Sequence, residues 1–351
     1  MGFHICISNE LAIDISLKNG VYGNVGGPDE NRKTIWGKVK DLYAIKPGDT
    51  IILYVKNPVS HLIGVFEVTS VPYICFDNLF EEDEIYPYRF NFKRKKYFPN
   101  PVPSFEFYSL VEAGLIESMI TLSRDVNSTY RGIRQLFESE YNEILNLFYK
   151  YNPKTDPENF DSKFNDVAIK NDIEAKNLDI EKLHEINIPT SISFNLIPSN
   201  KGSAILEDVL HAYIVYNVLH NTNNVREDLG LLNINELILE APIFKSMQFR
   251  SDILATFKHN ERIFYYSFFE LKKSAKIGIE EISQLMGYLK SFAASKSLPV
   301  NSYEGVYISR SFTDELIQYL IMRKTVENEN IISLISYDVD SFGVVTFKKI
   351  I

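Results

Sequence analysis

Two acidic residues and a lysine, placed at the ends of two apolar segments, are the side chains of this sequence best suited to chemistry. Asp252 opens the segment Asp252–Phe257, and Glu270, Leu271 and Lys272 close the segment that starts at Arg262. Both segments are rich in apolar and β-favouring residues, which predicts two strands of a hairpin. Glu270 and Lys272 are two residues apart, so their side chains share one face of a strand, where a carboxylate from the adjoining strand can meet them.

These residue types suit metal-dependent hydrolysis of a phosphodiester. Carboxylates from Asp252 and Glu270 are hard oxygen ligands for Mg²⁺, which keeps water in its coordination shell. A metal-bound water has a lowered pKa and can attack phosphorus. Lys272 could position that water or stabilise the charge that develops on the phosphorus oxygens. An isolated Glu-x-Lys pair on a strand is more often a surface ion pair, so the surrounding elements must decide between the two interpretations.

The elements around these residues predict an α/β unit with a central mixed sheet. A helix is expected over 203–220, with Ser203 as N-cap, and a second over Glu280–Ala294, where apolar residues recur on one face. A third helix is expected over Thr313–Arg323. The remaining extended segments are Glu236–Phe244, Tyr303–Ser309, Ile331–Tyr337 and Val344–Lys348.

The order of these residues resembles the PD-(D/E)XK nuclease superfamily, in which a helical Glu precedes an Asp on one strand and Glu-x-Lys on the next. The matching positions are Glu207, Asp252, Glu270, Lys272, Gln284 and Tyr288. Ser251 stands where the superfamily name has proline. The resemblance covers roughly residues 200–350. It implies a nuclease fold, Glu207 as a third metal ligand, Gln284 as a catalytic residue, and Mg²⁺ or alternatively Mn²⁺ as the cofactor.

Several neighbouring residues have both a functional and a plain interpretation. Glu207 could be a capping residue of its helix, and Glu240 could be a further metal ligand or a strand-end charge. Phosphate contact and a solvated helix face are both open for Lys273, Lys276 and Lys290. The histidines, His259 among them, show no metal-ligand spacing, and no role is assigned to them.

The first 150 residues predict a small, largely antiparallel barrel or curled sheet with few helices. A short helix is expected over Leu11–Leu17 and a longer one over Glu138–Tyr149. The turn Lys46–Asp49 leads into one of the strands. The expected strands are Phe3–Ile7, Thr50–Val55, His61–Thr69, Tyr86–Phe92 and Ser104–Tyr108.

Three segments in this region resemble, in order and spacing, the EVE branch of the PUA-like fold, which is related to YTH domains. They are Ile45–Tyr54, Leu62–Tyr73 and Tyr86–Phe90, and Arg131–Arg134 is similar to the end of such domains. The resemblance covers roughly residues 1–150. It implies a domain that flips a modified base out of its stack into an aromatic pocket and reads its edge through hydrogen bonds.

The resemblance to YTH domains also suggests pocket residues. Tyr22 and Asn24 would be a wall and an edge contact, Phe80 falls where a YTH tryptophan is expected, and Trp36 is a further candidate wall. A core position is the alternative for each ring. The run Lys93, Arg94, Lys95 and Lys96 could contact the DNA backbone, although such a run is also common on plain surfaces.

Composition limits these interpretations and suggests the domain boundaries. The net charge is −9, and residues 151–200 carry 5 basic and 9 acidic side chains, so almost half of the excess lies in one stretch. We therefore predict a reader domain over 1–152, a linker over 153–200 with one short helix near Asp172–His184, and a nuclease domain over 201–351. The charge excludes a protein that coats DNA by bulk electrostatics. No phosphate-binding loop for a nucleotide triphosphate is found.

The combined expectation is a modification-dependent DNA endonuclease of restriction type, acting on double-stranded DNA as a homodimer. The absence of an apolar run of about 18 residues and of a basic leader argues against a membrane partner and for the cytoplasm. Two alternatives remain open. One is a protein that binds modified RNA or DNA, with a non-catalytic nuclease-like scaffold, and the other is a structure-specific repair nuclease.

Overall fold

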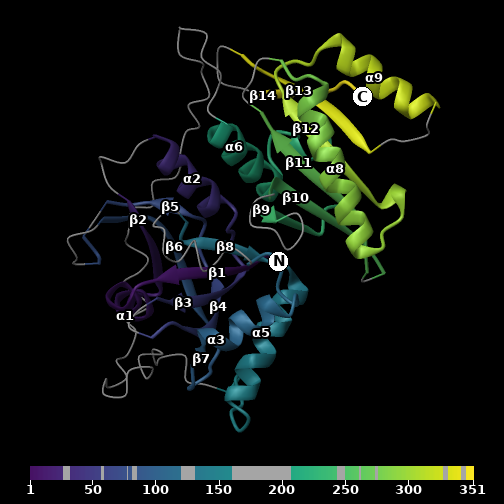
Figure 1. Cartoon of the computed structure of the whole chain (residues 1–351). Coiled ribbons are helices and arrows are strands. Elements are labelled where there is room, and N and C mark those ends of the chain that lie inside the picture. The colour runs from purple at the N-terminus through teal and green to yellow at the C-terminus, as the bar shows by residue number, and fades with distance from the viewer. Residues whose placement is uncertain are drawn as a thin grey trace. The chain divides into compact units, whose positions relative to one another are not determined.

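The computed structural model describes residues 1–26, 32–56, 59–76, 78–80, 85–119, 131–159, 207–242, 250–260, 262–272, 276–326, 331–340 and 345–351. The chain divides into two compact units, Met1–Ile192 and Ser193–Ile351, which are coloured purple to teal and teal to yellow in Figure 1. Of the predicted linker, only residues 153–159 are described, and the predicted short helix lies outside the described residues. In the described segment, the Pro157 carbonyl accepts a hydrogen bond from the Tyr97 backbone N–H (2.8 Å).

The first unit is built on one mixed sheet in the order β2-β6-β4-β3-β1-β8. The β1–β3 pair is parallel, and its other paired strands run antiparallel. Most of the predicted strands are therefore confirmed, within an α+β unit. The strands are β1 Phe3–Ser8, β2 Val21–Gly26, β3 Thr50–Val55, β4 His61–Val68, β5 Tyr73–Ile74, β6 Ile85–Lys96, β7 Val102–Pro103 and β8 Ile133–Leu136.

Four described helices accompany this sheet: α1 Glu10–Asn19, α2 Arg32–Tyr43, α3 Ser104–Glu112 and α5 Glu138–Tyr151. The helices expected near α1 and α5 are confirmed, whereas α2 was not predicted. The strand predicted over Ser104–Tyr108 is wrong. Phe105 and Phe107 would share one face of a strand, but in a helix they point about 200° apart. Phe107 lies in the core and Phe105 is exposed, which fits the helix.

The turn before β3 holds the first residues of the chain in place. Asp49 is buried, accepts hydrogen bonds from the backbone N–H groups of Gly2 (2.5 Å) and Lys46 (3.1 Å), and lies 3.1 Å from His4 Nε2. Burial by itself would raise the pKa of the Asp49 carboxyl, but the contacts with His4, Gly2 and Lys46 lower it. The Pro-Gly-Asp turn thus fastens β1 beside β3.

The second unit contains a six-stranded sheet in the order β14-β13-β12-β11-β10-β9. It is mixed, as predicted. β11, β12 and β13 are parallel neighbours, and the strands on either side of them are antiparallel. The strands are β9 Glu236–Pro242, β10 Arg250–His259, β11 Arg262–Leu271, β12 Tyr303–Ser309, β13 Ile332–Val339 and β14 Val345–Lys349.

Helices cover this second sheet. α8 packs on the Phe268 face of β11, where Phe292 meets the Phe268 ring at 4.9 Å between centroids. Phe269 points to the opposite face and is also buried, so both faces of β11 are covered. The helical segments are α6 Glu207–His220, α7 Val225–Asp228, α8 Ile279–Lys296, the 3₁₀ turn η3 Val300–Ser302 and α9 Asp314–Val326. Within the described parts of the chain, no helix is both long and apolar enough to cross a membrane.

Candidate functional site

The start of β10 and the end of β11 bring Asp252 and Glu270 together in the second unit. Ile253 pairs with Phe269 in this antiparallel hairpin. The residue before Ile253 and the residue after Phe269 therefore lie opposite each other, which places Asp252 beside Glu270 on one face. Asp252 Oδ2 accepts a hydrogen bond from the Leu271 backbone N–H (2.7 Å). The carboxylate of one strand is therefore held by the backbone of the other.

Lys272 lies against Glu270, as the two-residue spacing predicts. Its Nζ donates a hydrogen bond to Glu270 Oε2 (3.1 Å), and its backbone N–H donates to the Ile308 carbonyl of β12 (2.9 Å). Glu207 is the first residue of α6 and is near enough to raise the pKa of Glu270 by its charge. The structure thus gathers four of the predicted residues. Gln284 is on α8, but its side chain lies outside the described residues.

The electrostatics of this cluster follow from its burial. Burial raises the pKa of Asp252 well above its ordinary value, and the charges of Glu270 and Glu240 add to the rise. Burial likewise raises the pKa of Glu270, against the attraction of Lys272. Burial alone would lower the pKa of Lys272, but Glu270 and Asp252 raise it, so the ammonium stays charged. A divalent cation would relieve this repulsion between carboxylates.

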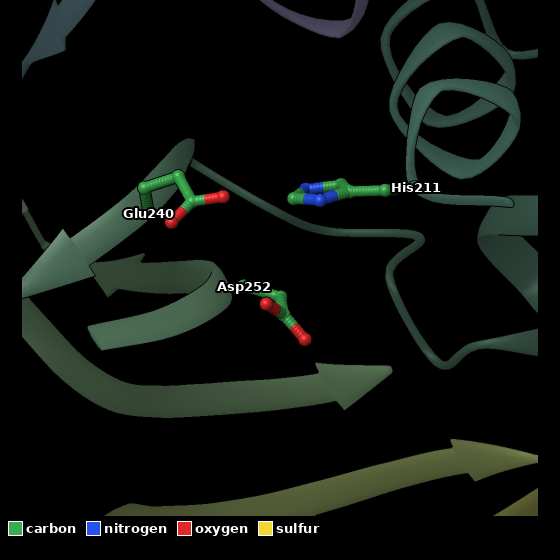
Figure 2. A group of neighbouring side chains, drawn as sticks. All are labelled: His211, Glu240 and Asp252. Atoms are coloured by element: carbon green, nitrogen blue, oxygen red, sulfur yellow. The ribbon is translucent and has the colours of Figure 1, made fainter. Parts of the chain in front are cut away.

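Two more potential ligands complete the cluster. Figure 2 shows His211 from α6, Glu240 from β9 and Asp252 pointing toward one another. The candidate ligand atoms of these three residues all lie within 4.8 Å of one another. The sequence assigns no role to the histidines, and the structure places His211 beside two of the acidic residues. The signal that was available is the four-residue interval from Glu207 to His211, which places both on one face of a helix.

Tyr307 and Arg310 also lie at this edge of the sheet and were not singled out from the sequence. Tyr307 pairs with Glu270 across β11 and β12, and its hydroxyl donates to the Glu281 carbonyl (2.7 Å). Arg310 follows β12 directly and interacts with Tyr337, which also senses the charge of Glu207. Lys276 and Lys290 are exposed, and Lys273 lies outside the described residues.

In the first unit, Tyr22 and Phe80 are core residues and do not form the walls of an open pocket. Tyr22 is 0% exposed, its hydroxyl contacts the carbonyl oxygens of Ile7 and Gly132 (both 2.9 Å), and its ring stacks on Phe90. Phe80 is 2% exposed and stacks on Tyr86 at 4.6 Å between centroids. Both rings are enclosed by other side chains and take the core position that is the alternative for each.

Asn24 has the properties expected of a residue that hydrogen-bonds to the edge of a base. It lies two residues after Tyr22 on β2 and is 8% exposed, and no described residue accepts a hydrogen bond from its Nδ2. A Cβ at Gly132 would stand 2.7 Å from the Asn24 side chain and from the Tyr22 hydroxyl, so β2 and the start of β8 approach closely because residue 132 is glycine. Trp36 is half-buried on α2.

The four residues of the predicted basic run have different partners. All four lie on β6, whose pairing with β4 shifts register between Arg94 and Lys96, so the simple alternation of a strand is interrupted there. Lys93 is 62% exposed and pairs with Glu67 (3.1 Å), whereas Lys96 is 15% exposed and pairs with Glu158 (2.6 Å). Lys95 donates to Thr50 Oγ1 (2.9 Å) and Arg94 lies over the Tyr97 ring. Lys93 remains the most accessible of the four for a phosphate.

The chain resembles several known proteins, although no family model matches it. It is 30% identical over 105 residues to the UPF0310 protein PH1033 of Pyrococcus horikoshii, with 26% of this chain and 66% of that protein covered. This coverage is just under two thirds of that relative. The human THYN1 protein, solved with DNA containing 5-methylcytosine, is 13% identical and covers 45% of this chain and 100% of its own at a TM-score of 0.30.

The YTH domain of Zygosaccharomyces rouxii MRB1, solved with N6-methyladenosine RNA, is 18% identical. The match covers 42% of this chain and 83% of that domain at a TM-score of 0.25.

Proposed function

We propose that this protein is a metal-dependent endonuclease that acts on DNA carrying a modified base. The observation that carries the cleavage half is the convergence of Asp252, Glu270 and Lys272 at one edge of the second sheet, with the Lys272 ammonium 3.1 Å from Glu270. Two carboxylates and a lysine from adjoining strands are a sufficient set for metal-assisted attack of water on a phosphodiester.

Each residue has a part in this mechanism. Asp252 and Glu270 would hold the cation, with Glu207 close by; the cation would supply a water of lowered pKa at phosphorus. Lys272 keeps its proton because of the surrounding carboxylates. When Glu270 no longer accepts the hydrogen bond from Lys272, the Lys272 ammonium can turn toward the phosphate oxygens. Negative charge grows on these oxygens as a P–O ester bond breaks. Arg310, at the same edge, offers a second cation for the nucleic acid backbone.

The proposal that the protein binds a modified base rests on separate observations. Human THYN1 and the yeast YTH domain were solved with 5-methylcytosine DNA and N6-methyladenosine RNA, which suggests a modified nucleic acid as the partner of the first unit. In this chain, the buried amide nitrogen of Asn24 is a donor that no described residue satisfies, as an edge-reading group requires. These observations concern binding alone. A protein that binds modified RNA or DNA through the first unit, without cleavage, is therefore the second candidate.

One experiment separates these functions. The full chain is incubated with Mg²⁺ or Mn²⁺ and with DNA duplexes of one sequence that differ only in base modification. We expect cleavage of a modified duplex and little cleavage of the unmodified one. Equal cleavage of both contradicts modification dependence. Binding of a modified DNA or RNA without cleavage favours the second candidate, and cleavage of unmodified branched DNA favours a repair nuclease.

Matched variants identify the site responsible. Glu270→Gln or Lys272→Ala should reduce cleavage by at least about 100-fold, the size of effect expected when one electrostatic contact to a transition state is lost. Glu315→Gln changes an exposed carboxylate on α9 in the same unit and should leave cleavage unchanged. All three variants should bind the modified duplex as the wild type does. Retained cleavage in Glu270→Gln would refute the assigned site.

A further inference from the structure

We propose that His211 and Glu240 form, together with Asp252, a metal site that prefers a first-row transition ion over Mg²⁺. This inference deepens the proposed function, because it names the class of ion, and it rests only on the metal-binding part of that function. His211 and Glu240 belong to α6 and β9, so the site is assembled from three separate elements of the second unit.

The geometry is the first argument. One ligand atom from each of His211, Glu240 and Asp252 lies within 4.8 Å of the other two, and Figure 2 shows the three side chains converging on one space. Ligand atoms around a shared ion stand roughly 3–4 Å apart, given metal–ligand bonds of about 2.0–2.2 Å. Small side-chain rotations would therefore close this group around an ion.

The placement of the histidine is the second argument. His211 is 2% exposed, on a helix whose residues 209–215 are all buried. The four-residue interval to Glu207 puts both side chains on the face of α6 that meets the cluster. The buried ring of His211 therefore has a candidate ligand atom within 4.8 Å of one from each of two partly buried carboxylates, those of Glu240 and Asp252.

The donor set is the third argument. Mg²⁺ binds oxygen ligands in a near-ideal octahedron and keeps several waters. An imidazole nitrogen instead favours first-row transition ions, whose affinity for mixed nitrogen and oxygen sites rises along the series from Mn²⁺ to Cu²⁺. Glu240 and Asp252 offer carboxylate oxygens beside the imidazole. The charge of Glu270 raises the pKa of Asp252, that of Glu207 raises the pKa of Glu270, and both add negative potential. A single nitrogen among these oxygens favours ions such as Mn²⁺ or Co²⁺.

Metal binding to the full chain, without DNA, tests this inference. Metal-free protein is titrated with Co²⁺ and with Mg²⁺ by calorimetry, and the Mn²⁺ complex is measured by pulsed electron paramagnetic resonance. We expect Co²⁺ to bind at least about tenfold more tightly than Mg²⁺, and the Mn²⁺ spectrum to carry the nitrogen coupling of an imidazole. In His211→Gln, the nitrogen coupling should disappear and Co²⁺ affinity should fall by about 10- to 100-fold.

The controls keep each outcome decisive. His259→Gln removes an exposed histidine of β10 in the same unit and should change neither measurement. Glu240→Gln should weaken Co²⁺ binding while leaving the nitrogen coupling, and it serves if His211→Gln fails to fold. Mg²⁺ binding as tight as Co²⁺, or nitrogen coupling that survives in His211→Gln, overturns the inference. Co²⁺ binding with the expected coupling but without DNA cleavage upholds the metal site and counts against the nuclease.

Discussion

Asp252 of β10 is tied to β11 through a hydrogen bond from the Leu271 backbone N–H to its Oδ2, over 2.7 Å. The paired backbones end at Ile253 and Phe269, so a side chain takes over where the backbone ladder stops. The same carboxylate has an oxygen within 4.8 Å of candidate ligand atoms of Glu240 and His211. One residue thereby closes the hairpin and presents a ligand to the candidate metal site.

Substitutions at Asp252 should separate these two roles. Asp252→Asn keeps an oxygen for the Leu271 N–H and removes the charge, so we expect cleavage to be abolished with little loss of stability. Asp252→Ala leaves that N–H without its acceptor, which should cost about 1–3 kcal/mol of unfolding free energy as well. Calorimetric unfolding and cleavage of a modified duplex measure the two effects. Full activity in Asp252→Asn would contradict the role of its charge.

The contacts of Asp49 predict a pH-dependent contribution to stability. Its pKa in the folded chain is lowered, so the contribution is complete above the unfolded value of about 3.9 and is lost as the pH falls through the lowered folded pKa. The difference in unfolding free energy between wild type and Asp49→Asn should therefore be largest near neutral pH and shrink below about pH 4. Trp36, the only tryptophan, lies in this unit and reports its urea unfolding by fluorescence. A difference that grows on acidification would contradict the prediction.

Two glycines of the first unit should respond in opposite directions to alanine. At Gly132 a Cβ would meet the Asn24 side chain and the Tyr22 hydroxyl at 2.7 Å, so Gly132→Ala should destabilise the unit by about 1–3 kcal/mol through overpacking. At Gly37, within α2, a Cβ meets nothing within 4 Å. Gly37→Ala should stabilise the helix by about 0.5–1 kcal/mol. Urea unfolding followed by circular dichroism tests both, and equal effects would mean that the close approach of β2 and β8 is unimportant.

Substitutions at Tyr22 and at Asn24 should affect different properties, stability in the first case and binding of modified DNA in the second. Tyr22→Phe loses the hydroxyl that contacts Ile7 and Gly132, and we expect a loss of about 1 kcal/mol of stability, the size of one lost hydrogen bond, because the Gly132 carbonyl still accepts from the Ile7 backbone N–H. Asn24→Ala should cost little stability, because no described residue depends on its Nδ2. The affinity of the Asn24→Ala variant for modified DNA should instead fall by about tenfold, the equivalent of one lost hydrogen bond. Fluorescence anisotropy with labelled duplexes measures the affinities, and unchanged binding in Asn24→Ala would contradict an edge contact by Asn24.

Local patterns in the sequence were sufficient for much of the fold and for part of the site. The two-residue spacing of Glu270 and Lys272 determines that they share a face of any strand, and the bounds of Arg262–Leu271 and Tyr303–Ser309 match β11 and β12. The strand prediction for Ser104–Tyr108 was wrong. In so short a segment, the positions of Phe105 and Phe107 are compatible with the period of a strand and with that of a helix. It also did not reveal the burial of Tyr22 and Phe80, because an aromatic residue suits a core as well as a pocket.

By itself, then, the sequence determined which side chains are neighbours along an element, since the periods of strands and helices are local properties of the backbone. Only the tertiary structure decided that His211 and Glu240 join Asp252, that the basic residues of β6 find separate acidic partners in Glu67 and Glu158, and that Asn24 meets Gly132. Those meetings depend on how helices and strands distant in the sequence pack and pair. Packing is set by the summed shape and burial of many side chains, and no spacing within a single segment contains that information.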